Sequence, residues 1–246
     1  MDAVLLAGGV GARLRPLTDA MPKPLLPIGD SSALDTALRC LRRGGVTRVF
    51  VAAGYRADMV RAFVEDGSRW DLDVQVSVEE KPLGTAGPLA LLRPQLCEPF
   101  ILMNGDVLTT LDFGRFRRQA SASRAALTAV TTTISIDLAY GRVTGTGNRI
   151  DAVEEKPELS AEVLAGIYLL RPAALNVIPD DQPFGVDELI EALLQRGCGV
   201  HRYAADAYWR DIGQPADYEA AQDEYSLLFA RKVRTVDRGR SRIAAA

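Results

Sequence analysis

The chain has 246 residues, of which 48% are apolar and 25% charged, the usual balance of a soluble globular protein. The net charge of −3 does not favour a nucleic-acid partner. A lone histidine, His201, nearly excludes a histidine base or a pair of histidine ligands, and three widely spaced cysteines argue against a disulfide framework or a zinc site. No apolar run approaches the ~20 residues of a membrane-spanning helix, and the first run lacks the basic start of a signal peptide. We therefore expect a cytoplasmic protein without a membrane partner.

In the first half of the chain, apolar runs typical of strands alternate with helical stretches. The expected strands are Val4–Ala7, Arg48–Ala53, Asp73–Val78 and Phe100–Met103. The expected helices are Ala33–Arg43, which ends at two glycines, Ala57–Glu65 and Pro88–Leu92. This alternation predicts an α/β fold of the Rossmann-like, three-layer α/β/α kind, with a mixed, mostly parallel central sheet.

The second half is richer in strands. The expected strands are Ala125–Ser135, Arg142–Thr144, Arg149–Glu154 and Val163–Leu170, and the expected helices are Glu188–Gln195 and Ala216–Leu228. Small and polar residues at 145–148 predict a hairpin turn between two of these strands. Because no linker or repeat divides the chain, we expect a single domain over residues 1–230, followed by a basic, flexible tail at 231–246.

A glycine-rich loop follows the first expected strand. It reads Leu6-Ala7-Gly8-Gly9-Val10-Gly11-Ala12-Arg13-Leu14, and Lys23 follows between two prolines. Glycines let backbone N–H groups approach phosphate oxygens, and both cations suit a phosphate. The dinucleotide fingerprint lacks its third glycine, because Leu14 stands there, and the P-loop pattern is absent. From the residues alone, phosphate binding and a purely structural turn are about equally open.

The sequence around this loop resembles a known family over a longer stretch than the loop itself. The segments Leu5–Thr18 and Met21–Gly29 resemble the N-terminal signature of the sugar-1-phosphate nucleotidyltransferases. The resemblance implies that the loop wraps the triphosphate and that Arg13 and Lys23 are catalytic, neutralising it and its transition state. The nucleotide-binding residues implied here are Leu6, Ala7, Gly8, Gly9, Gly11 and Arg13.

Two aspartates far apart in the sequence are candidate metal ligands. Asp106 follows a buried strand in Asn104-Gly105-Asp106, where ligands of open α/β sheets bind, and Asp211 lies in Trp209-Arg210-Asp211-Ile212-Gly213. Taken alone, each aspartate could equally cap a helix. The family resemblance, which continues to Pro215-Ala216-Asp217-Tyr218, implies that Asp106 and Asp211 bind the magnesium ion, Mg²⁺, and makes Asp106 catalytic.

The second half carries the motifs of an acceptor site. Glu154-Glu155-Lys156-Pro157 resembles the family's E-K-P, in which glutamate binds sugar hydroxyls and lysine binds the sugar's phosphate. The acceptor-binding residues implied are Tyr140, Gly141, Glu155, Lys156, Ala165 and Gly166, with Lys156 also catalytic. Leu164 replaces a common asparagine and Arg142 a small residue. A leucine cannot hydrogen-bond a hydroxyl, so a heptose, an aminosugar or a carbocyclic acceptor is worth testing.

The segment Glu79–Ala90 resembles the base-binding loop of mannose-1-phosphate guanylyltransferase-like members. A carboxylate only accepts hydrogen bonds, and guanine offers two adjacent donors, so Glu79 or Glu80 would suit guanine; the sequence leaves open which one faces the base. The resemblance adds nucleotide-binding residues Gly84, Thr85, Asn104 and Gly105. The nucleotide-binding part then covers about 1–110 and the acceptor-binding part about 111–230.

These motifs predict an enzyme that joins a nucleoside triphosphate, preferably GTP, to a sugar 1-phosphate or a sugar-like cyclitol phosphate and releases pyrophosphate. It would be a Mg²⁺-dependent guanylyltransferase acting on small molecules, and it could form a homo-oligomer. A uridylyl- or thymidylyltransferase of the same family is the alternative. A glycosyltransferase of similar architecture would not need the glycine loop with Lys23, and a non-catalytic sensor usually loses one of the two cations or two aspartates that this chain retains.

Overall fold

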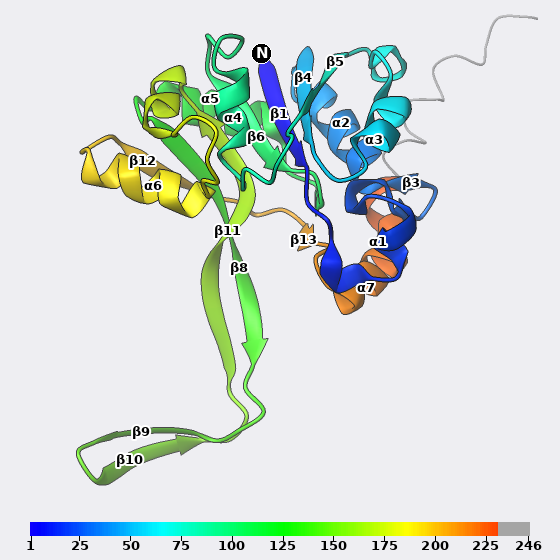
Figure 1. Ribbon diagram of the computed structural model, residues 1–246. Helices are drawn as coiled ribbons and strands as arrows, with labels where there is room; N and C mark the ends of the chain where they lie inside the picture. Colours follow the sequence, from blue (N-terminus) through cyan, green and yellow to red (C-terminus); the bar gives the residue numbers. More distant parts are fainter. Residues whose placement is uncertain (231–246) are drawn as a thin grey trace, which may run out of the picture.

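A computed structural model describes residues 1–230 (Figure 1). The strands are β1 (Asp2–Ala7), β2 (Pro27–Ile28), β3 (Ser31–Ser32), β4 (Arg48–Ala53), β5 (Asp73–Val78), β6 (Phe100–Asn104), β7 (Val107–Thr109), β8 (Leu127–Asp137), β9 (Arg142–Thr146), β10 (Arg149–Glu154), β11 (Glu158–Leu170), β12 (Val200–Ala204) and β13 (Trp209–Asp211). The α-helices are α1 (Leu17–Ala20), α2 (Ala33–Arg43), α3 (Ala57–Val64), α4 (Pro88–Leu92), α5 (Phe113–Ala122), α6 (Val186–Gln195) and α7 (Pro215–Tyr225). Short helical turns are η1 (Ala12–Leu14), η2 (Lys23–Leu25), η3 (Ser68–Trp70), η4 (Pro172–Val177) and η5 (Ser226–Ala230). The predicted tail at 231–246 lies outside the described residues.

The central sheet has seven strands in the order β12-β8-β11-β6-β1-β4-β5. Strands β6, β1, β4 and β5 are parallel, β11 is antiparallel to both of its neighbours, and β12 is parallel to β8. The predicted mixed, mostly parallel sheet is therefore confirmed. The register places Leu6 of β1 beside both Ala52 of β4 and Asn104 of β6, so three strand ends meet at one edge.

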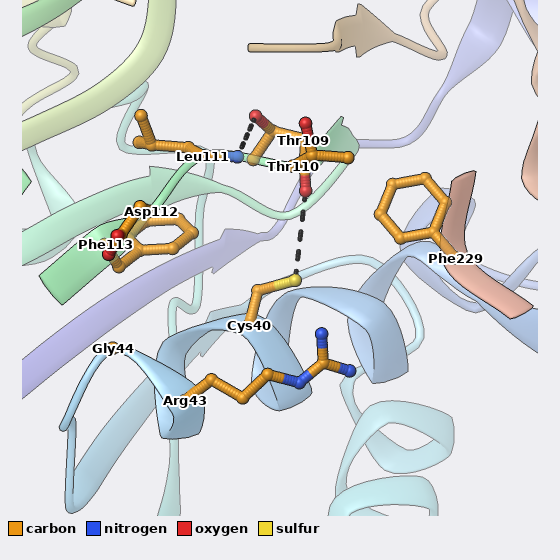
Figure 2. Close-up of a pocket in the computed structure, with 9 residues that line it drawn as sticks. All are labelled: Cys40, Arg43, Gly44, Thr109, Thr110, Leu111, Asp112, Phe113 and Phe229. Carbon is orange, nitrogen blue, oxygen red and sulfur yellow. Dashed lines mark hydrogen bonds between the residues drawn. The ribbon is translucent and has the colours of Figure 1, made fainter. Parts of the chain in front are cut away.

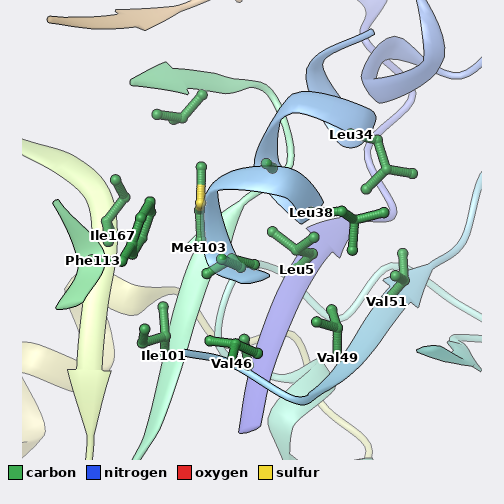
Figure 3. Packing of buried hydrophobic residues seen from close by; sticks show 14 of the residues in the cluster. Leu5, Leu34, Leu38, Val46, Val49, Val51, Ile101, Met103, Phe113 and Ile167 are labelled. Atoms are coloured by element: carbon green, nitrogen blue, oxygen red, sulfur yellow. The ribbon is translucent and has the colours of Figure 1, made fainter. Parts of the chain in front are cut away.

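Alternating side chains of the strands supply two separate cores. In β1, Leu5 belongs to the core covered by α2, α3 and α5, part of which is drawn in Figure 3. Val4 belongs to the core covered by α4 and α6. The same alternation divides β6, where Met103 and Leu102 face opposite sides. Because successive side chains of a strand point to opposite faces, fully apolar strands need a helix layer on each side. The predicted three-layer arrangement follows from this pattern.

The strand boundaries differ from the expected ones mainly in the second half. Strand β11 begins at Glu158 instead of Val163, and β8 ends at Asp137 instead of Ser135. The added residues pair with each other in an antiparallel ladder, which an isolated apolar pattern does not reveal. Helix α5 was not expected, although Asp112 caps it by accepting a hydrogen bond from the Arg115 N–H at 2.9 Å.

A long two-stranded extension leaves the body of the protein, and we call residues 132–164 the arm. It consists of the outer parts of β8 and β11 and ends in the β9–β10 hairpin, which lies far from the helices in Figure 1. The predicted hairpin turn is confirmed, with the β9–β10 pairing closing at Thr146 and Arg149. No helix within residues 1–230 is long and apolar enough to cross a membrane.

A buried carboxylate fastens α2 to the turn before β5. Asp35 accepts hydrogen bonds from Trp70 Nε1 at 2.9 Å and Arg39 Nε at 2.7 Å, and Ser31 also donates to it. Burial raises the pKa of Asp35, but the hydrogen bonds from Arg39, Ser31 and Trp70 outweigh this and leave the pKa below its ordinary value. Asp35 is therefore a stabilising anion in the folded state.

Replacing this carboxylate is expected to destabilise the fold. Asp35→Ala leaves the buried Trp70 N–H without its acceptor, so unfolding in urea should show a loss of about 2–3 kcal/mol. Because the folded pKa is lowered, the wild-type advantage is present above the unfolded value of 3.8 and is lost as the pH falls below it. Asp58→Ala, at an exposed position, is the control and should change stability by less than about 0.5 kcal/mol. Equal losses for both variants would contradict this role.

Candidate active site

Two clefts adjoin the carboxyl ends of the central strands. The strand-end cleft has a volume of about 320 Å³ and is lined by Leu6, Gly8, Gly9, Val10, Ala52, Glu79, Pro82, Gly84, Thr85, Pro88, Asn104 and Asp106. The arm-side cleft, about 780 Å³, is lined by Arg13, Thr132, Thr133, Ile134, Ser135, Ala207, Tyr208, Trp209, Arg210, Asp211, Gly213, Gln214, Asp217 and Glu224. Because ligands of open α/β sheets bind beyond the carboxyl ends of the strands, these clefts form the candidate active site.

The glycine loop forms one wall of the strand-end cleft. Gly11 has φ +65°, which glycine adopts without strain, and its carbonyl accepts a hydrogen bond from the Thr18 hydroxyl at 2.9 Å. A Cβ on Gly8 would lie 2.1 Å from Glu79 Oε1, so any larger residue there would displace this carboxylate. The loop thus combines a tight turn with an approach of backbone to a charged side chain.

Glu79 is the one of the two predicted base-binding glutamates that faces the cleft. Its Oε2 accepts a hydrogen bond from the Leu83 N–H at 3.1 Å, which fixes the carboxylate over the cleft. Burial raises the pKa of Glu79, although the Leu83 N–H opposes the shift. Glu80, in contrast, is exposed and does not line the cleft. Of the two glutamates that the sequence left open, Glu79 is thus the one that lines the cleft.

A lysine and two aspartates meet where the two clefts join. Lys23 is 8% exposed, and its ammonium pairs with Asp106 Oδ2 and lies 3.5 Å from Asp211 Oδ1. Pairing of β13 with β7 brings the aspartates together, because Asp211 lies opposite Val107 and the Ile212 N–H donates to the Asp106 carbonyl at 3.1 Å. Neither aspartate caps a helix, since Asp211 ends β13 and α7 is preceded by Gln214.

The aspartate pair meets the chemical requirements of a magnesium site. Asp106 Oδ1 is buried and has no hydrogen-bond partner among residues 1–230. Burial and the charge of Asp106 raise the pKa of Asp211, while Lys23 opposes the rise, so a neighbouring positive charge favours the ionised form of Asp211. The described residues contain no cluster of three or more His, Cys, Asp or Glu ligands. Two carboxylates are nevertheless enough for Mg²⁺, which takes its other ligands from phosphate and water.

Two arginines and three carboxylates line the arm-side cleft, and several of them are hydrogen-bonded to each other. Arg13 lines it, and a Cβ on Gly213 would lie 3.0 Å from the Arg13 guanidinium. Arg210 donates to Glu224 Oε1 at 2.8 Å, and the Tyr208 hydroxyl donates to Glu224 Oε2 at 2.6 Å. Burial, with the Glu224 hydrogen bond second, raises the pKa of Tyr208 to about 12, so this phenol remains protonated at neutral pH.

The structure brings together most of the predicted nucleotide-binding residues. Leu6, Gly8, Gly9, Glu79, Gly84, Thr85, Asn104 and Asp106 line the strand-end cleft, and Arg13 and Asp211 line the adjoining one. Ala7, Gly11 and Gly105 lie in the same segments without lining either cleft, and the Gly105 N–H donates to the Leu6 carbonyl at 2.9 Å. The Thr85 hydroxyl accepts from the Val186 N–H at 2.9 Å, so it anchors α6 to the loop.

The predicted acceptor-binding residues are not gathered at these clefts. Tyr140, Gly141, Glu155 and Lys156 lie where the β9–β10 hairpin joins the rest of the arm, and none lines either cleft. Ala165 and Gly166 lie at the base of the arm. A Cβ on Gly166 would lie 2.6 Å from Asn104 Nδ2, and the Ala165 carbonyl accepts from Trp209 Nε1 at 2.8 Å. The motif is thus divided between the two ends of the arm. Leu164, 44% exposed, lines neither cleft.

Several cleft residues were not expected from the sequence. Ala52 lies at the end of β4 beside Leu6, a position that the parallel pairing of adjacent strands could have indicated. Pro82 and Pro88 belong to the base-binding motif, and Val10 to the glycine loop, but their apolar side chains gave no chemical signal. Residues 132–135 of the arm also line a cleft, which only the tertiary structure reveals.

Another cavity, of about 260 Å³, lies between α2 and the segment after β7 (Figure 2). Cys40 Sγ donates to the Thr109 carbonyl at 3.8 Å there, and Phe229 closes one side. None of the predicted site residues lines this cavity. We therefore place the candidate active site in the two clefts at the strand ends.

Comparisons with known proteins agree with this geometry. A family model described as nucleotidyl transferase matches residues 2–226. The chain is 35% identical over 227 residues to the mannose-1-phosphate guanyltransferase of Schizosaccharomyces pombe, covering 89% of this chain and 62% of that protein. It is 32% identical over 241 residues to the mannose-1-phosphate guanyltransferase of Candida albicans, covering 94% of this chain and 66% of that protein. The chain thus spans a little under two thirds of the length of these relatives.

Solved structures share the fold. HddC from Yersinia pseudotuberculosis in complex with GMP-PN superposes with a TM-score of 0.70 at 25% identity, covering 91% of this chain and 99% of that one. A protein described as a glucose-1-phosphate thymidylyltransferase from Bacillus anthracis, in complex with sucrose, superposes with a TM-score of 0.75 at 22% identity, covering 91% and 94%. The family model covers almost all of the described residues, including the strand-end clefts and the lysine–aspartate cluster. The chain therefore belongs to the nucleotidyl transferase family.

Proposed function

We propose that this protein transfers a guanylyl group from GTP to a sugar 1-phosphate or a sugar-like cyclitol phosphate, with Mg²⁺ as cofactor and pyrophosphate as second product. The observation that carries the proposal is the position of the Glu79 carboxylate in the strand-end cleft, next to the cluster of Lys23, Asp106 and Asp211. One end of the site then suits a base and the other suits phosphates. The printed names of the relatives support guanylyl transfer to a sugar 1-phosphate.

The preference for guanine rests on hydrogen-bond chemistry. A carboxylate accepts hydrogen bonds and donates none, and the N1 and N2 groups of guanine are two adjacent donors. The Leu83 N–H occupies Glu79 Oε2, which holds the carboxylate in one orientation. Uracil and thymine present carbonyl oxygens beside their single N–H, and these oxygens would be repelled by Glu79. GTP should therefore be used better than UTP or dTTP.

The transfer needs positioning and positive charge more than acid–base chemistry. The phosphate oxygen of the acceptor is already anionic, so it can attack the α-phosphorus of GTP without a general base. The bond between the α-phosphorus and the bridging oxygen breaks, and pyrophosphate leaves with that oxygen and its electron pair. Lys23, held in a buried position, and Arg13, at the adjoining cleft, would neutralise the phosphates. Asp106 and Asp211 would hold Mg²⁺, which supplies further positive charge when bound.

The proposal is tested by measuring pyrophosphate release. The purified chain is assayed with Mg²⁺, each of GTP, UTP, dTTP, ATP and CTP, and a panel of mannose, glucose, heptose, aminosugar and cyclitol phosphates. Release that requires both GTP and one of the acceptors is the expected result. Release with another nucleotide would overturn the guanine assignment, while nucleotide binding without turnover on any acceptor would indicate a non-catalytic sensor.

Glu79→Gln should weaken the use of GTP and stabilise the free protein. Loss of the charged acceptor should raise the KM for GTP roughly 10- to 100-fold, because hydrogen bonds to charged groups contribute about 1.5–3 kcal/mol. Burial raises the pKa of Glu79, so the carboxyl favours folding below its unfolded pKa and this contribution is lost as the pH rises through the folded value. The variant, which cannot ionise, should melt at a higher temperature than wild type near pH 7 and at the same temperature near pH 4.

Glu80→Gln is the matched control, since it makes the same change on the exposed neighbouring residue. It should leave both the KM for GTP and the melting temperature unchanged. An equal rise in KM for GTP, UTP and dTTP in Glu79→Gln would mean that Glu79 does not read the base.

A further inference from the structure

The acceptor motif of this chain stands apart from its own phosphate-binding cluster, because neither Glu155 nor Lys156 lines either of the two clefts. The part of the arm that lines the arm-side cleft ends at Ser135, which pairs with Ser160. Lys156 lies four residues further out along the other strand, which corresponds to about 13 Å in an extended strand. Transfer requires one acceptor molecule to contact the motif at Lys156 and the cluster at Lys23 together. This inference therefore rests on the proposed function.

The arm is built as a continuous ribbon. Its strands pair without interruption from Leu164 and Thr131 to Glu158 and Asp137, a length of about 20 Å. Glu155 and Lys156 lie at the outer end of this ladder, so a bend at the hairpin junction would move the hairpin but not these two residues. The register of β8 and β11 shifts only between Leu164 and Tyr168, at the base of the arm.

The base of the arm is fastened to the body. Glu162 Oε1 accepts a hydrogen bond from the Thr131 hydroxyl at 2.7 Å, and its other oxygen pairs with Arg202 of β12. At the register shift, the Ala165 carbonyl accepts from Trp209 Nε1, and the Asn104 side chain fills the space that a Cβ on Gly166 would occupy. These contacts tie the base to three neighbouring segments and oppose rotation of the arm back onto its own body.

Apolar side chains of the outer arm are exposed to solvent, and no other part of residues 1–230 covers them. Tyr140 is 77% exposed, and Val143, Ile150 and Val153 of the β9–β10 hairpin are 56%, 62% and 64% exposed. A two-stranded hairpin is marginally stable in water unless it packs on another surface. The arm therefore combines an acceptor motif with an apolar surface that requires a partner.

We propose that two copies of this chain exchange arms, so that the acceptor motif of one copy enters the arm-side cleft of the other. Glu155 and Lys156 would then contact the sugar and its phosphate in the partner's site, opposite Lys23 and the two aspartates. Such an exchange satisfies two-fold symmetry, because each arm occupies the same cleft on the other copy. Each active site would contain the nucleotide-binding residues of one chain and the acceptor motif of the other.

The first test mixes two inactive variants. Asp106→Asn disables the nucleotide side and Lys156→Met the acceptor side, and each variant alone should lose pyrophosphate release. When the two are co-expressed with different tags, each heterodimer has one site with both Asp106 and Lys156 intact, provided that arms are exchanged. Isolated heterodimers should then recover about half of the wild-type activity per dimer. If each chain uses its own arm, both sites of the heterodimer are disabled, and an inactive heterodimer overturns the proposal.

The second test is independent of activity, so failure of the proposed function can be told apart from failure of the exchange. Sedimentation of the full chain at micromolar concentration should show a dimer. Combined replacement of Val143, Ile150 and Val153 by serine should dissociate it, because these exposed side chains would form the contact. Unchanged circular dichroism would show that the variant is folded. A wild-type monomer, or a dimer unaffected by the replacements, would overturn the arm exchange even if GTP were never turned over.

Discussion

Asp106→Asn is expected to lower kcat for pyrophosphate release by about a thousandfold, with little change in the melting temperature of the free protein. Asp106 pairs with Lys23, and its second oxygen is buried without a partner among residues 1–230. An asparagine keeps the shape but supplies no negative charge, so it should bind Mg²⁺ poorly. The rate with saturating GTP and acceptor, measured across a Mg²⁺ titration, gives both kcat and the Mg²⁺ dependence.

The control for this variant is Asp58→Asn, which makes the same replacement at an exposed position of α3. It should leave kcat and the Mg²⁺ dependence unchanged. Asp211→Asn should resemble Asp106→Asn, because both carboxylates face the same lysine. Full activity of either cluster variant at low Mg²⁺ would remove that residue from the metal site.

Lys23→Met is expected to lower kcat by about 10³- to 10⁴-fold, within the range known for a cation that stabilises a phosphoryl-transfer transition state. The lysine is buried between the two aspartates, so its loss also leaves two neighbouring carboxylates without their internal cation. Mg²⁺ should then raise the melting temperature of Lys23→Met more than that of wild type. Thermal unfolding without nucleotide, with and without Mg²⁺, measures this second effect.

Lys81→Met provides the comparison, since Lys81 forms an exposed ion pair with Asp181 at 2.8 Å. Exposed ion pairs contribute little, so its kcat and its response to Mg²⁺ should match the wild type. If Lys23→Met lost activity but responded to Mg²⁺ as wild type does, the lysine would not compete with a metal for the aspartates. In that case it would act on the phosphates alone.

Part of the candidate site could be predicted because its residues are contiguous or terminate strands. The apolar runs at 4–7 and 100–103 indicated strands, and residues that follow parallel strands meet at one edge of a sheet. The glycine loop, Asn104 and Asp106 could therefore be placed near each other from local patterns. The choice between Glu79 and Glu80 could not be predicted from the sequence. It depends on where β5 ends against β4 and on the space left by Gly8 and Gly54.

The sequence by itself determined the layered α/β fold and the family motifs, since strand alternation and strand-end residues are local properties of the chain. Only the tertiary structure decided that Asp106 and Asp211 share Lys23, because the pairing of β7 with β13 joins segments far apart in sequence. It also decided that the acceptor motif at 155–156 stands on an extended arm. A ladder between two distant strands is set by their mutual register, and no periodicity within either strand specifies how far that ladder continues.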